Sequence, residues 1–277
     1  MTRNEIMANL EHKLAYLKEK GYRVAGIFLQ GSQNYDMAIH DKTYESDIDA
    51  KAWIIPPLED VVYERKKVSY TEILPDNSHI DVKDIRLVPE LMRKANVQYV
   101  ELVNTDYYIV DESILPIIEM RDEISSINKD QLIRTVFGMF LNKKAALRHP
   151  YPTLVDKLAK FGYDPKQLHH MLRLLVFAKD FYLNGKTFEE ALIPEKAEKE
   201  QLIMIKKGII PNEDCDVLVE EWRSDLFDLK LKVQAQHYPF DEDTHFILWN
   251  KIFNIVLEEI QGDGRFDVKK IKLLAKD

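Results

Sequence analysis

Residues that mark several large protein classes are scarce in this sequence. A single cysteine, Cys215, among 277 residues excludes an intramolecular disulfide framework and favours a reducing compartment. Nine glycines are too few for Gly-rich repeats or a collagen-like architecture. No run of about 18 apolar residues occurs, so the sequence predicts no membrane-spanning helix. The N-terminal segment carries charges throughout and lacks the apolar stretch of about 7–15 residues that a secretory signal needs, so we expect a cytoplasmic protein.

The remaining composition is that of a folded globular protein. Hydrophobic residues make up 45% of the chain and charged residues 31%, and 13 Tyr, 12 Phe and 3 Trp supply core material. This excludes wholesale disorder, which requires low hydrophobicity and few aromatic side chains. The length suits one large domain or two smaller ones.

The charge is unevenly distributed along the chain. The net charge of −8 argues against non-specific coating of duplex DNA over a broad surface. Between residues 143 and 179, however, eight basic residues outnumber two acidic ones, which gives this segment a net charge of +6. Such a segment favours a binding site for phosphate or a polyanion, and the alternative is an ordinary solvated helical surface. The eight are Lys143, Lys144, Arg148, Lys157, Lys160, Lys166, Arg173 and Lys179.

Hydrophobic periodicity divides the chain into two parts. The first part has a helical pattern over residues 1–20, a polar stretch at 33–46 and helical segments within 89–103. Its strand patterns are VAGIFLQGS, DIDAKAWIIPP and HIDVKDIRL. From about residue 130 nearly every segment has helical spacing, with breaks at Pro and Gly. The order of these elements predicts an α/β or α+β domain in the first part, a domain change near residues 112–130 and a helical bundle in the second part.

Acidic residues lie on two of the predicted strands. Side chains alternate between faces along a strand, so Asp47, Asp49 and Lys51 share one face. By the same rule Asp81 and Asp84 lie on opposite faces of their strand, and Asp84 shares its face with apolar residues. Clustered carboxylates repel one another unless a cation neutralises them, and hard oxygen ligands suit Mg²⁺. The candidate metal ligands are therefore Asp47, Asp49 and Asp81, and Asp84 is the less favoured alternative to Asp81.

Gly31 and Ser32 directly follow the first predicted strand. Glycine lets backbone N–H groups approach a phosphate closely, and the serine hydroxyl adds a further donor. A Gly-Ser pair and an Asp-x-Asp pair are each common in turns and at solvated strand ends. Their ordered combination with a third carboxylate on another strand is much rarer, and it favours a site for a metal ion and a phosphate.

A second candidate site lies on the helix predicted from Pro165. Asp164 is a typical N-cap residue, and proline is favoured at the first helical position. At about 100° per residue, Lys166, His170 and Arg173 fall within one narrow arc, opposite an apolar face. A row of this kind supplies the donors that a triphosphate needs. The alternative is an amphipathic helix whose charged face lies in water.

Three segments resemble a known superfamily. They are GSQNYDMAIHDKTYESDIDAKAWIIP, HIDVKDIRL followed by NVQYVEL, and HPYPTLVDKLAKFGYDPKQLHHMLRLL. These segments are similar to bacterial and phage-encoded predicted nucleotidyltransferases of the DNA polymerase β-like superfamily, some of which are associated with RNA repair. The resemblance covers roughly residues 25–185.

The resemblance implies an α+β fold, with a mixed-sheet catalytic domain over 1–120 and an α-helical bundle domain over 121–277 that completes a nucleotide cleft. It implies magnesium-dependent transfer of a nucleoside monophosphate from an NTP to an acceptor hydroxyl, with release of pyrophosphate. Two Mg²⁺ ions, with Mn²⁺ as the alternative, are expected at Asp47, Asp49 and Asp81, and Asp81 is expected to accept the proton of the acceptor. The nucleotide-binding residues are expected to be Gly31, Ser32, Lys51, Lys166, His170 and Arg173. Salt bridging to Asp49 or Asp81 is an equally good expectation for Lys51.

The resemblance leaves the acceptor open. An RNA end fits the family association and the basic segment, in which Lys143, Lys144 and Arg148 are the expected RNA contacts. A small molecule or a protein side chain is the alternative acceptor. A non-catalytic nucleotide- or RNA-binding module on the same fold is the second functional hypothesis, and three intact carboxylates argue against it. No membrane partner is expected, and the oligomeric state is left open.

Overall fold

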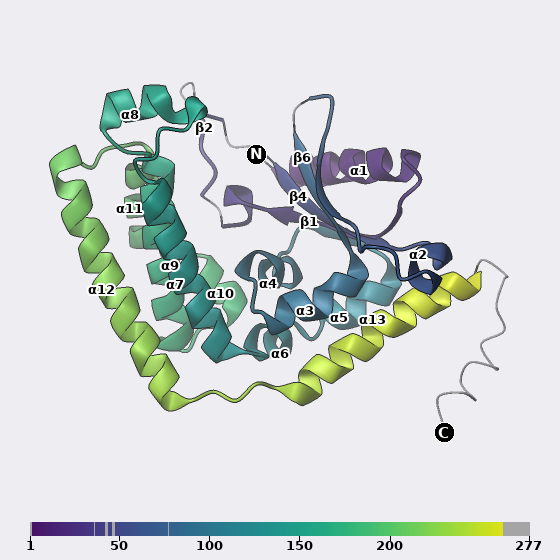
Figure 1. The fold of residues 1–277 in the computed structure, drawn as a ribbon. Coiled ribbons are helices and arrows are strands. Elements are labelled where there is room, and N and C mark those ends of the chain that lie inside the picture. Colours follow the sequence, from purple (N-terminus) through teal and green to yellow (C-terminus); the bar gives the residue numbers. More distant parts are fainter. Residues whose placement is uncertain (1, 36, 42–43, 46–47, 77, 263–277) are drawn as a thin grey trace.

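The computed structural model describes residues 2–262, apart from 36, 42–43, 46–47 and 77. Its first part combines a β-sheet with short helices, and its second part is helical (Figure 1). The predicted α+β fold is therefore confirmed. Asp47, one of the candidate metal ligands, lies outside the described residues.

Five strands form the main sheet in the order β5–β6–β4–β1–β7. β4 and β6 are parallel and the other neighbours are antiparallel, so the sheet is mixed, as predicted. The three predicted strands are its central ones, whereas the edge strands β5 and β7 were not predicted. The bounds are β1 (Arg23–Gln30), β4 (Asp49–Ile55), β5 (Ser69–Ile73), β6 (His79–Asp84) and β7 (Tyr108–Val110), and a separate pair consists of β2 (His40–Asp41) and β3 (Tyr44–Glu45).

The two faces of the sheet pack against different helices. α1 (Arg3–Glu19) covers one face, where Leu10 and Leu17 are fully buried. The opposite face carries Phe28 and Trp53, whose ring centres lie 4.5 Å apart. This second face belongs to the hydrophobic cluster that continues into the helical part of the chain, so it is the face on which a site between the two parts can form.

Twelve further helices follow within the described residues. In the first part they are short and follow the chain around the sheet, and from α7 onward most are long. Their bounds are α2 (Leu58–Val62), α3 (Val88–Arg93), α4 (Val97–Val103), α5 (Leu115–Ile118), α6 (Arg121–Ser126), α7 (Lys129–Ala146), α8 (Val155–Phe161), α9 (Pro165–Tyr182), α10 (Phe188–Leu192), α11 (Lys196–Lys206), α12 (Asn212–Gln236) and α13 (Glu242–Gly262).

α9 is the central helix of the helical part, and it packs against α7, α10, α11 and α12. Asp164 caps α9 by accepting a hydrogen bond from the backbone N–H of Lys166, and Pro165 is the first helical residue, as predicted. The side of α9 that the periodicity predicts to be apolar is buried, namely Leu168, Met171, Leu172, Leu175 and Ala178.

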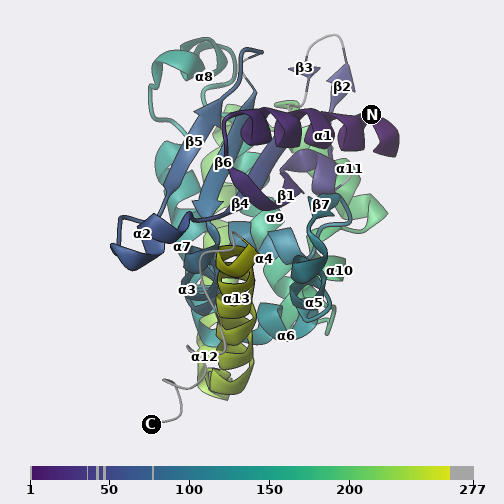
Figure 2. The ribbon, with the colours of Figure 1, turned by 90° about the vertical axis from the view of Figure 1, so that its right-hand side faces the viewer.

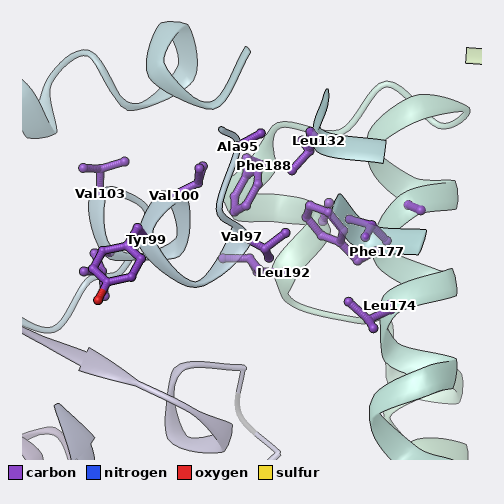
Figure 3. Close-up of a cluster of buried hydrophobic side chains, with 14 of the residues drawn as sticks. Ala95, Val97, Tyr99, Val100, Val103, Leu132, Leu174, Phe177, Phe188 and Leu192 are labelled. Atoms are coloured by element: carbon purple, nitrogen blue, oxygen red, sulfur yellow. The ribbon is translucent and has the colours of Figure 1, made fainter. Parts of the chain in front are cut away.

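One hydrophobic cluster joins the two parts of the chain. Val97 of α4 lies beside Phe188 and Leu192 of α10, and Phe177 of α9 belongs to the same cluster (Figure 3). α13 returns from the helical part and packs against α3, α5 and α6 (Figures 1 and 2). The domain boundary at residue 120 stays a prediction, because the core continues across it. Within the described part of the chain, no helix is long and apolar enough to cross a membrane.

Candidate functional site

A pocket of about 220 Å³ lies between the sheet and the helical part. The end of β1, the short helix η1 (Ser32–Tyr35), the start of β4, and helices α4, α7, α9 and α11 all contribute to its lining. Lys51 and Asp81 do not line it. The pocket brings together six of the residues predicted from the sequence: Gly31, Ser32, Asp49, Lys166, His170 and Arg173.

The turn after β1 brings the backbone close to Asp49. Gly31 has a φ of +94°, a conformation that favours glycine. A Cβ atom at this position would lie 3.2 Å from Asp49 Oδ2, so a larger residue would press on the carboxylate. The glycine therefore serves both the turn and the close approach of the chain to Asp49. Ser32 follows as the first residue of η1.

Asp81 of β6 is held by two lysines. Its carboxylate accepts hydrogen bonds from Lys51 at 2.6 Å and Tyr99 at 2.7 Å, and Lys83 Nζ lies 2.9 Å from its other oxygen. Burial alone would raise the pKa of Asp81, but these three donors together outweigh it and hold the pKa below its usual value. Asp81 is therefore a charged carboxylate whose two oxygens are both engaged.

Lys51 is buried, and it takes the salt-bridge alternative. Its ammonium group pairs with Asp81 rather than Asp49, and it lies 4.6 Å from the centre of the Tyr99 ring. The strand register explains the choice of partner, because Lys51 stands directly opposite Asp81 in the parallel pair of β4 and β6. Lys51 therefore points its charge at a carboxylate of the sheet and is absent from the pocket lining.

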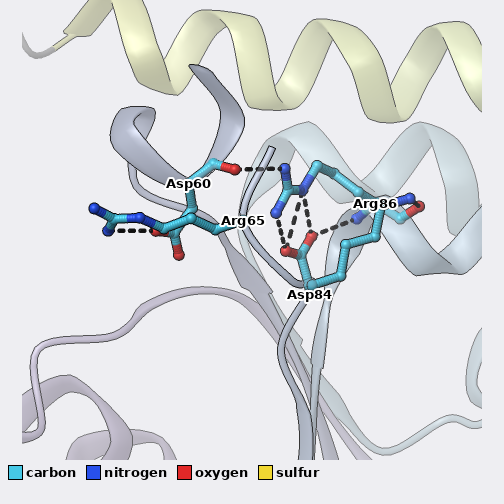
Figure 4. A network of polar contacts seen from close by, with 5 residues as sticks. Asp60, Arg65, Asp84 and Arg86 are labelled. Atoms are coloured by element: carbon cyan, nitrogen blue, oxygen red, sulfur yellow. Dashed lines mark hydrogen bonds and ion pairs between the residues drawn. The ribbon is translucent and has the colours of Figure 1, made fainter. Parts of the chain in front are cut away.

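Asp84, the less favoured alternative to Asp81, pairs with an arginine of its own chain segment. It is 1% exposed and accepts hydrogen bonds from the guanidinium group and the backbone N–H of Arg86 (Figure 4). Arg86 also donates a hydrogen bond to the backbone carbonyl of Asp60 (Figure 4). A buried carboxylate with a bidentate arginine partner is neutralised in place and stabilises the end of β6.

Asp49 is the described carboxylate that best fits a hard cation. It is exposed at the pocket and forms no ion pair with any described residue. The other carboxylate of the lining, Glu101, pairs with Arg173. Over the described ranges no group of three or more His, Cys, Asp or Glu side chains is placed to hold a metal ion, and Asp47 lies outside those ranges. The expected metal ions therefore stay a prediction that rests on Asp47 and Asp49.

The pocket wall opposite Asp49 is cationic. Lys166 and Arg173 of α9 face the pocket together with Lys143 of α7 and Lys206 of α11. Burial, reinforced by the neighbouring charges of Lys166 and Arg173, lowers the pKa of Lys143. Like charges gathered at one place favour an anionic ligand, which would relieve their repulsion.

His170 lines the pocket as a neutral side chain. Burial lowers its pKa well below the usual value, and the charges of Arg173, Lys143 and Lys166 lower it further. The adjacent His169 is buried, and its Nδ1 lies 2.9 Å from the carbonyl oxygen of Leu202. The predicted row on α9 therefore reaches the pocket, but it carries two positive charges and a neutral imidazole rather than three cations.

Three pocket residues form a cluster that sequence reasoning did not assemble. The Tyr35 hydroxyl donates a hydrogen bond of 2.5 Å to Glu101, whose other carboxylate oxygen lies 3.6 Å from Arg173 Nη2. The Arg173 guanidinium lies over the Tyr35 ring, 4.1 Å from its centre. We call these three residues the Glu101 cluster. Its members come from η1, α4 and α9, and no periodic pattern connects them.

The basic residues of the segment 143–179 do not all face the pocket. Lys144, Arg148 and Lys179 form ion pairs with carboxylates of α12, namely Glu220, Asp216 and Asp225. Of the three expected RNA contacts, only Lys143 lines the pocket. The basic segment therefore partly lines the pocket and partly forms ion pairs between helices.

Comparisons with known proteins add little to this geometry. No family model matches the chain, and no curated protein matches it. Among solved structures, the chain is similar to a nucleotidyltransferase-like protein from Exiguobacterium sibiricum, with 11% sequence identity, a TM-score of 0.28, and coverage of 91% of this chain and 90% of that chain.

Proposed function

We propose that this protein is a nucleotidyltransferase, which moves a nucleoside monophosphate from an NTP to an acceptor hydroxyl and releases pyrophosphate. The observation that supports this most is the composition of the pocket. A Gly-Ser turn and the carboxylate of Asp49, which pairs with no described residue, stand on one wall, and the cationic face of α9 stands on the other. Phosphate binding needs the turn and the cations, whereas a pocket that only binds anions has no use for Asp49.

The cationic wall is suited to the triphosphate of the substrate. Lys143, Lys166, Arg173 and Lys206 outnumber the two carboxylates of the lining, so the pocket attracts anions. Lys166 is exposed and pairs with no described carboxylate, which leaves its ammonium group available to the β- and γ-phosphates. The same side chains would stabilise the charge that develops on the departing pyrophosphate.

The donor set of the opposite wall fits a divalent metal in part. Asp49 offers hard oxygen ligands, and Asp47 is the proposed second ligand because the strand pattern puts the two on one face. Mg²⁺, or Mn²⁺ in its place, would neutralise phosphate charge there and lower the pKa of the acceptor hydroxyl. Asp81 would join as the third ligand only if its contacts with Lys51 and Lys83 loosen.

The proposed reaction is an in-line displacement. The acceptor oxygen forms a bond to the α-phosphorus while the bond from that phosphorus to the oxygen bridging the β-phosphorus breaks. The hydroxyl proton leaves the acceptor, and pyrophosphate leaves with the bonding electrons. Asp81 is the proposed proton acceptor, and the lysine contacts that lower its pKa make it a weak base until they loosen.

The test is to supply each of the four α-labelled NTPs with Mg²⁺ and separate pools of total RNA, total protein and small metabolites. Transfer of label to one pool by the wild type, and its loss in Asp49→Asn, supports the proposal and identifies the class of acceptor. An RNA end is the acceptor we propose first, because Lys143 joins the pocket to the basic segment. Tight NTP binding with no label transferred to any pool would favour the non-catalytic binding module instead.

A further inference from the structure

The Glu101 cluster joins the two walls of the pocket. Tyr35 belongs to η1, which begins at Ser32 directly after the Gly31 turn. Arg173 belongs to α9 in the helical part. Glu101 of α4 contacts both side chains, since one of its oxygens accepts the Tyr35 hydroxyl and the other faces Arg173. A single carboxylate therefore connects the phosphate-facing turn to the cationic helix.

Because Glu101 and Arg173 are both largely buried, each depends on the other to compensate its charge. Glu101 is 3% exposed, and the Arg173 side chain is 12% exposed. A buried carboxylate and a buried guanidinium are each costly alone, and each compensates for the other. The Tyr35 ring below the guanidinium and the Tyr35 hydroxyl on the carboxylate leave the pair few alternative arrangements.

The cluster also leaves one donor unused. Arg173 Nε is buried and has no hydrogen-bond partner in the described structure. An unsatisfied donor on a buried cation is unfavourable, and arginine binds phosphate oxygens with several N–H groups at once. The guanidinium is therefore fixed in place by Glu101 and Tyr35 with one buried donor, Nε, left unsatisfied in the described structure.

We infer that Glu101 is a positioning residue, which fixes Arg173 and, through Tyr35, the Gly31–Ser32 turn in the one arrangement that fits the terminal phosphates of a nucleotide. The inference rests on the proposed function only in naming a nucleotide as the ligand. Glu101 itself touches no substrate in this role. It acts through the two side chains that it holds.

A purely electrostatic role for Glu101 predicts the opposite change in anion affinity when its charge is removed. Glu101 brings a negative charge to a pocket that attracts anions, so removing that charge should strengthen anion binding if charge were its only contribution. If Glu101 positions Arg173, its removal should weaken anion binding although the pocket becomes more positive. Inorganic tripolyphosphate separates the two roles, because it carries the phosphates without a base or sugar.

The experiment compares Glu101→Gln and Tyr35→Phe with the wild type by calorimetric titration with tripolyphosphate. Glu101→Gln keeps the shape of the side chain, and Tyr35→Phe keeps the ring under Arg173 while removing the hydroxyl. We expect affinity to fall about tenfold in Glu101→Gln and about threefold in Tyr35→Phe. The double variant should lose no more than Glu101→Gln alone, because the hydroxyl acts through the carboxylate.

The matched control is Glu90→Gln on α3, which removes a carboxylate from an exposed ion pair with Arg93, away from the pocket. It should bind tripolyphosphate as the wild type does. In turnover, Glu101→Gln should raise the KM for NTP about tenfold and also lower kcat, because Arg173 is proposed to stabilise the departing pyrophosphate as well. Thermal melting checks that each variant is folded at the temperature of the titration.

The outcomes separate this inference from the proposed function. Tripolyphosphate binding that is equal or tighter in folded Glu101→Gln overturns the positioning role, whatever the turnover. Weaker binding supports it even if no acceptor is ever labelled, in which case only the transferase proposal fails. Absence of tripolyphosphate binding by the wild type would overturn both.

Discussion

Asp49 and Asp81 carry the same functional group in opposite surroundings. Asp49 is exposed, Gly31 leaves space beside its Oδ2, and it forms no ion pair with any described residue. The Asp81 carboxylate pairs with two lysines and accepts a hydrogen bond from a tyrosine hydroxyl. A group that must bind a variable ligand benefits from the first environment, and a group that holds its neighbours in place benefits from the second.

Replacement of Asp49 should therefore affect activity far more than stability. We expect Asp49→Asn to reduce nucleotidyl transfer by about a hundredfold or more, because an amide oxygen carries no charge for a divalent cation. The free energy of unfolding should change by no more than about 0.5 kcal/mol, since the residue is exposed and pairs with no described residue. Transfer rates at matched Mg²⁺ and urea unfolding measure the two effects.

The control for this variant is Asp225→Asn, which removes an exposed carboxylate of α12 that pairs with Lys179 of α9. Exposed ion pairs of this kind contribute about 0–1 kcal/mol, so both activity and stability should stay close to the wild type. Undiminished turnover by Asp49→Asn would contradict a catalytic metal site at this position.

His169 predicts a pH dependence of stability. Burial lowers the pKa of its imidazole to about 3 in the folded protein, against 6.5 as the ordinary value. Below pH 6.5 the unfolded chain binds a proton that the folded chain does not, so stability is complete above pH 6.5 and falls as the pH decreases toward 3. From pH 7.5 to 5.5 the free energy of unfolding should decrease by about 1 kcal/mol on account of this residue.

Urea unfolding of the wild type and of His169→Gln at the two pH values measures this contribution. The variant should be less stable at pH 7.5, because it disturbs the contact with the Leu202 carbonyl, but it should lose less stability on acidification. Equal losses in the two proteins would show that His169 is not the titrating group.

At the scale of single elements, local signals in the sequence predicted the fold well. The N-cap of α9 at Asp164 depends only on adjacent residues, so it was predicted correctly. The alternation along β6 also separated Asp81 from the buried Asp84 before any contact was known. These features depend on neighbours in the chain, which a sequence displays directly.

The elements that escaped prediction depend on neighbours in space. β5 and β7 are edge strands with exposed or half-buried side chains, so their hydrophobic pattern is weak. The Glu101 cluster joins residues 35, 101 and 173, and its three members became recognisable only when η1, α4 and α9 were packed together. The direction that each lysine of the basic segment takes was equally hidden, because it depends on where α12 lies.

Some basic residues between 143 and 179 line the pocket and others pair with α12, so substitutions on α9 and α7 should differ in their effects. Lys166→Ala should weaken NTP binding by about 1–3 kcal/mol, the range for loss of a charge-assisted hydrogen bond, and should weaken binding of the monophosphate less. Lys144→Ala is the matched control, because Lys144 belongs to the same basic segment but pairs with Glu220 of α12. Calorimetric titration with NTP and NMP decides the matter, and equal losses for both ligands in Lys166→Ala would place Lys166 away from the triphosphate.

At the scale of the whole molecule, the last described helix completes the first part of the fold. α13 follows α12 in the chain, yet its buried residues belong to the cluster that contains Val88 of α3 and Ile124 of α6. Leu248 and Ile252 are fully buried in this contact, while Phe253 is 53% exposed on the outer side. The two parts are therefore joined both by the shared hydrophobic cluster and by α13, which follows α12 and packs on the first part.

Two neighbouring residues of α13 test this arrangement. Ile252→Ala should lower the free energy of unfolding by about 2–4 kcal/mol, since it removes buried methylene and methyl groups and leaves a cavity. Phe253→Ala removes a larger side chain from the exposed side and should change the free energy by about 0.5 kcal/mol or less. Urea unfolding compares the two variants, and similar losses in both would mean that α13 does not pack on α3 and α6 as described.

The packing of α13 on the first part of the chain also affects how the protein folds during translation. While a ribosome is still synthesising the segment after residue 241, the nascent chain already contains α3, α5 and α6 but not the helix that covers their apolar side chains. During that interval this surface remains open to chaperones or to other nascent chains. Folding of the first part can therefore be completed only late in translation, although every residue of its sheet emerged from the ribosome long before.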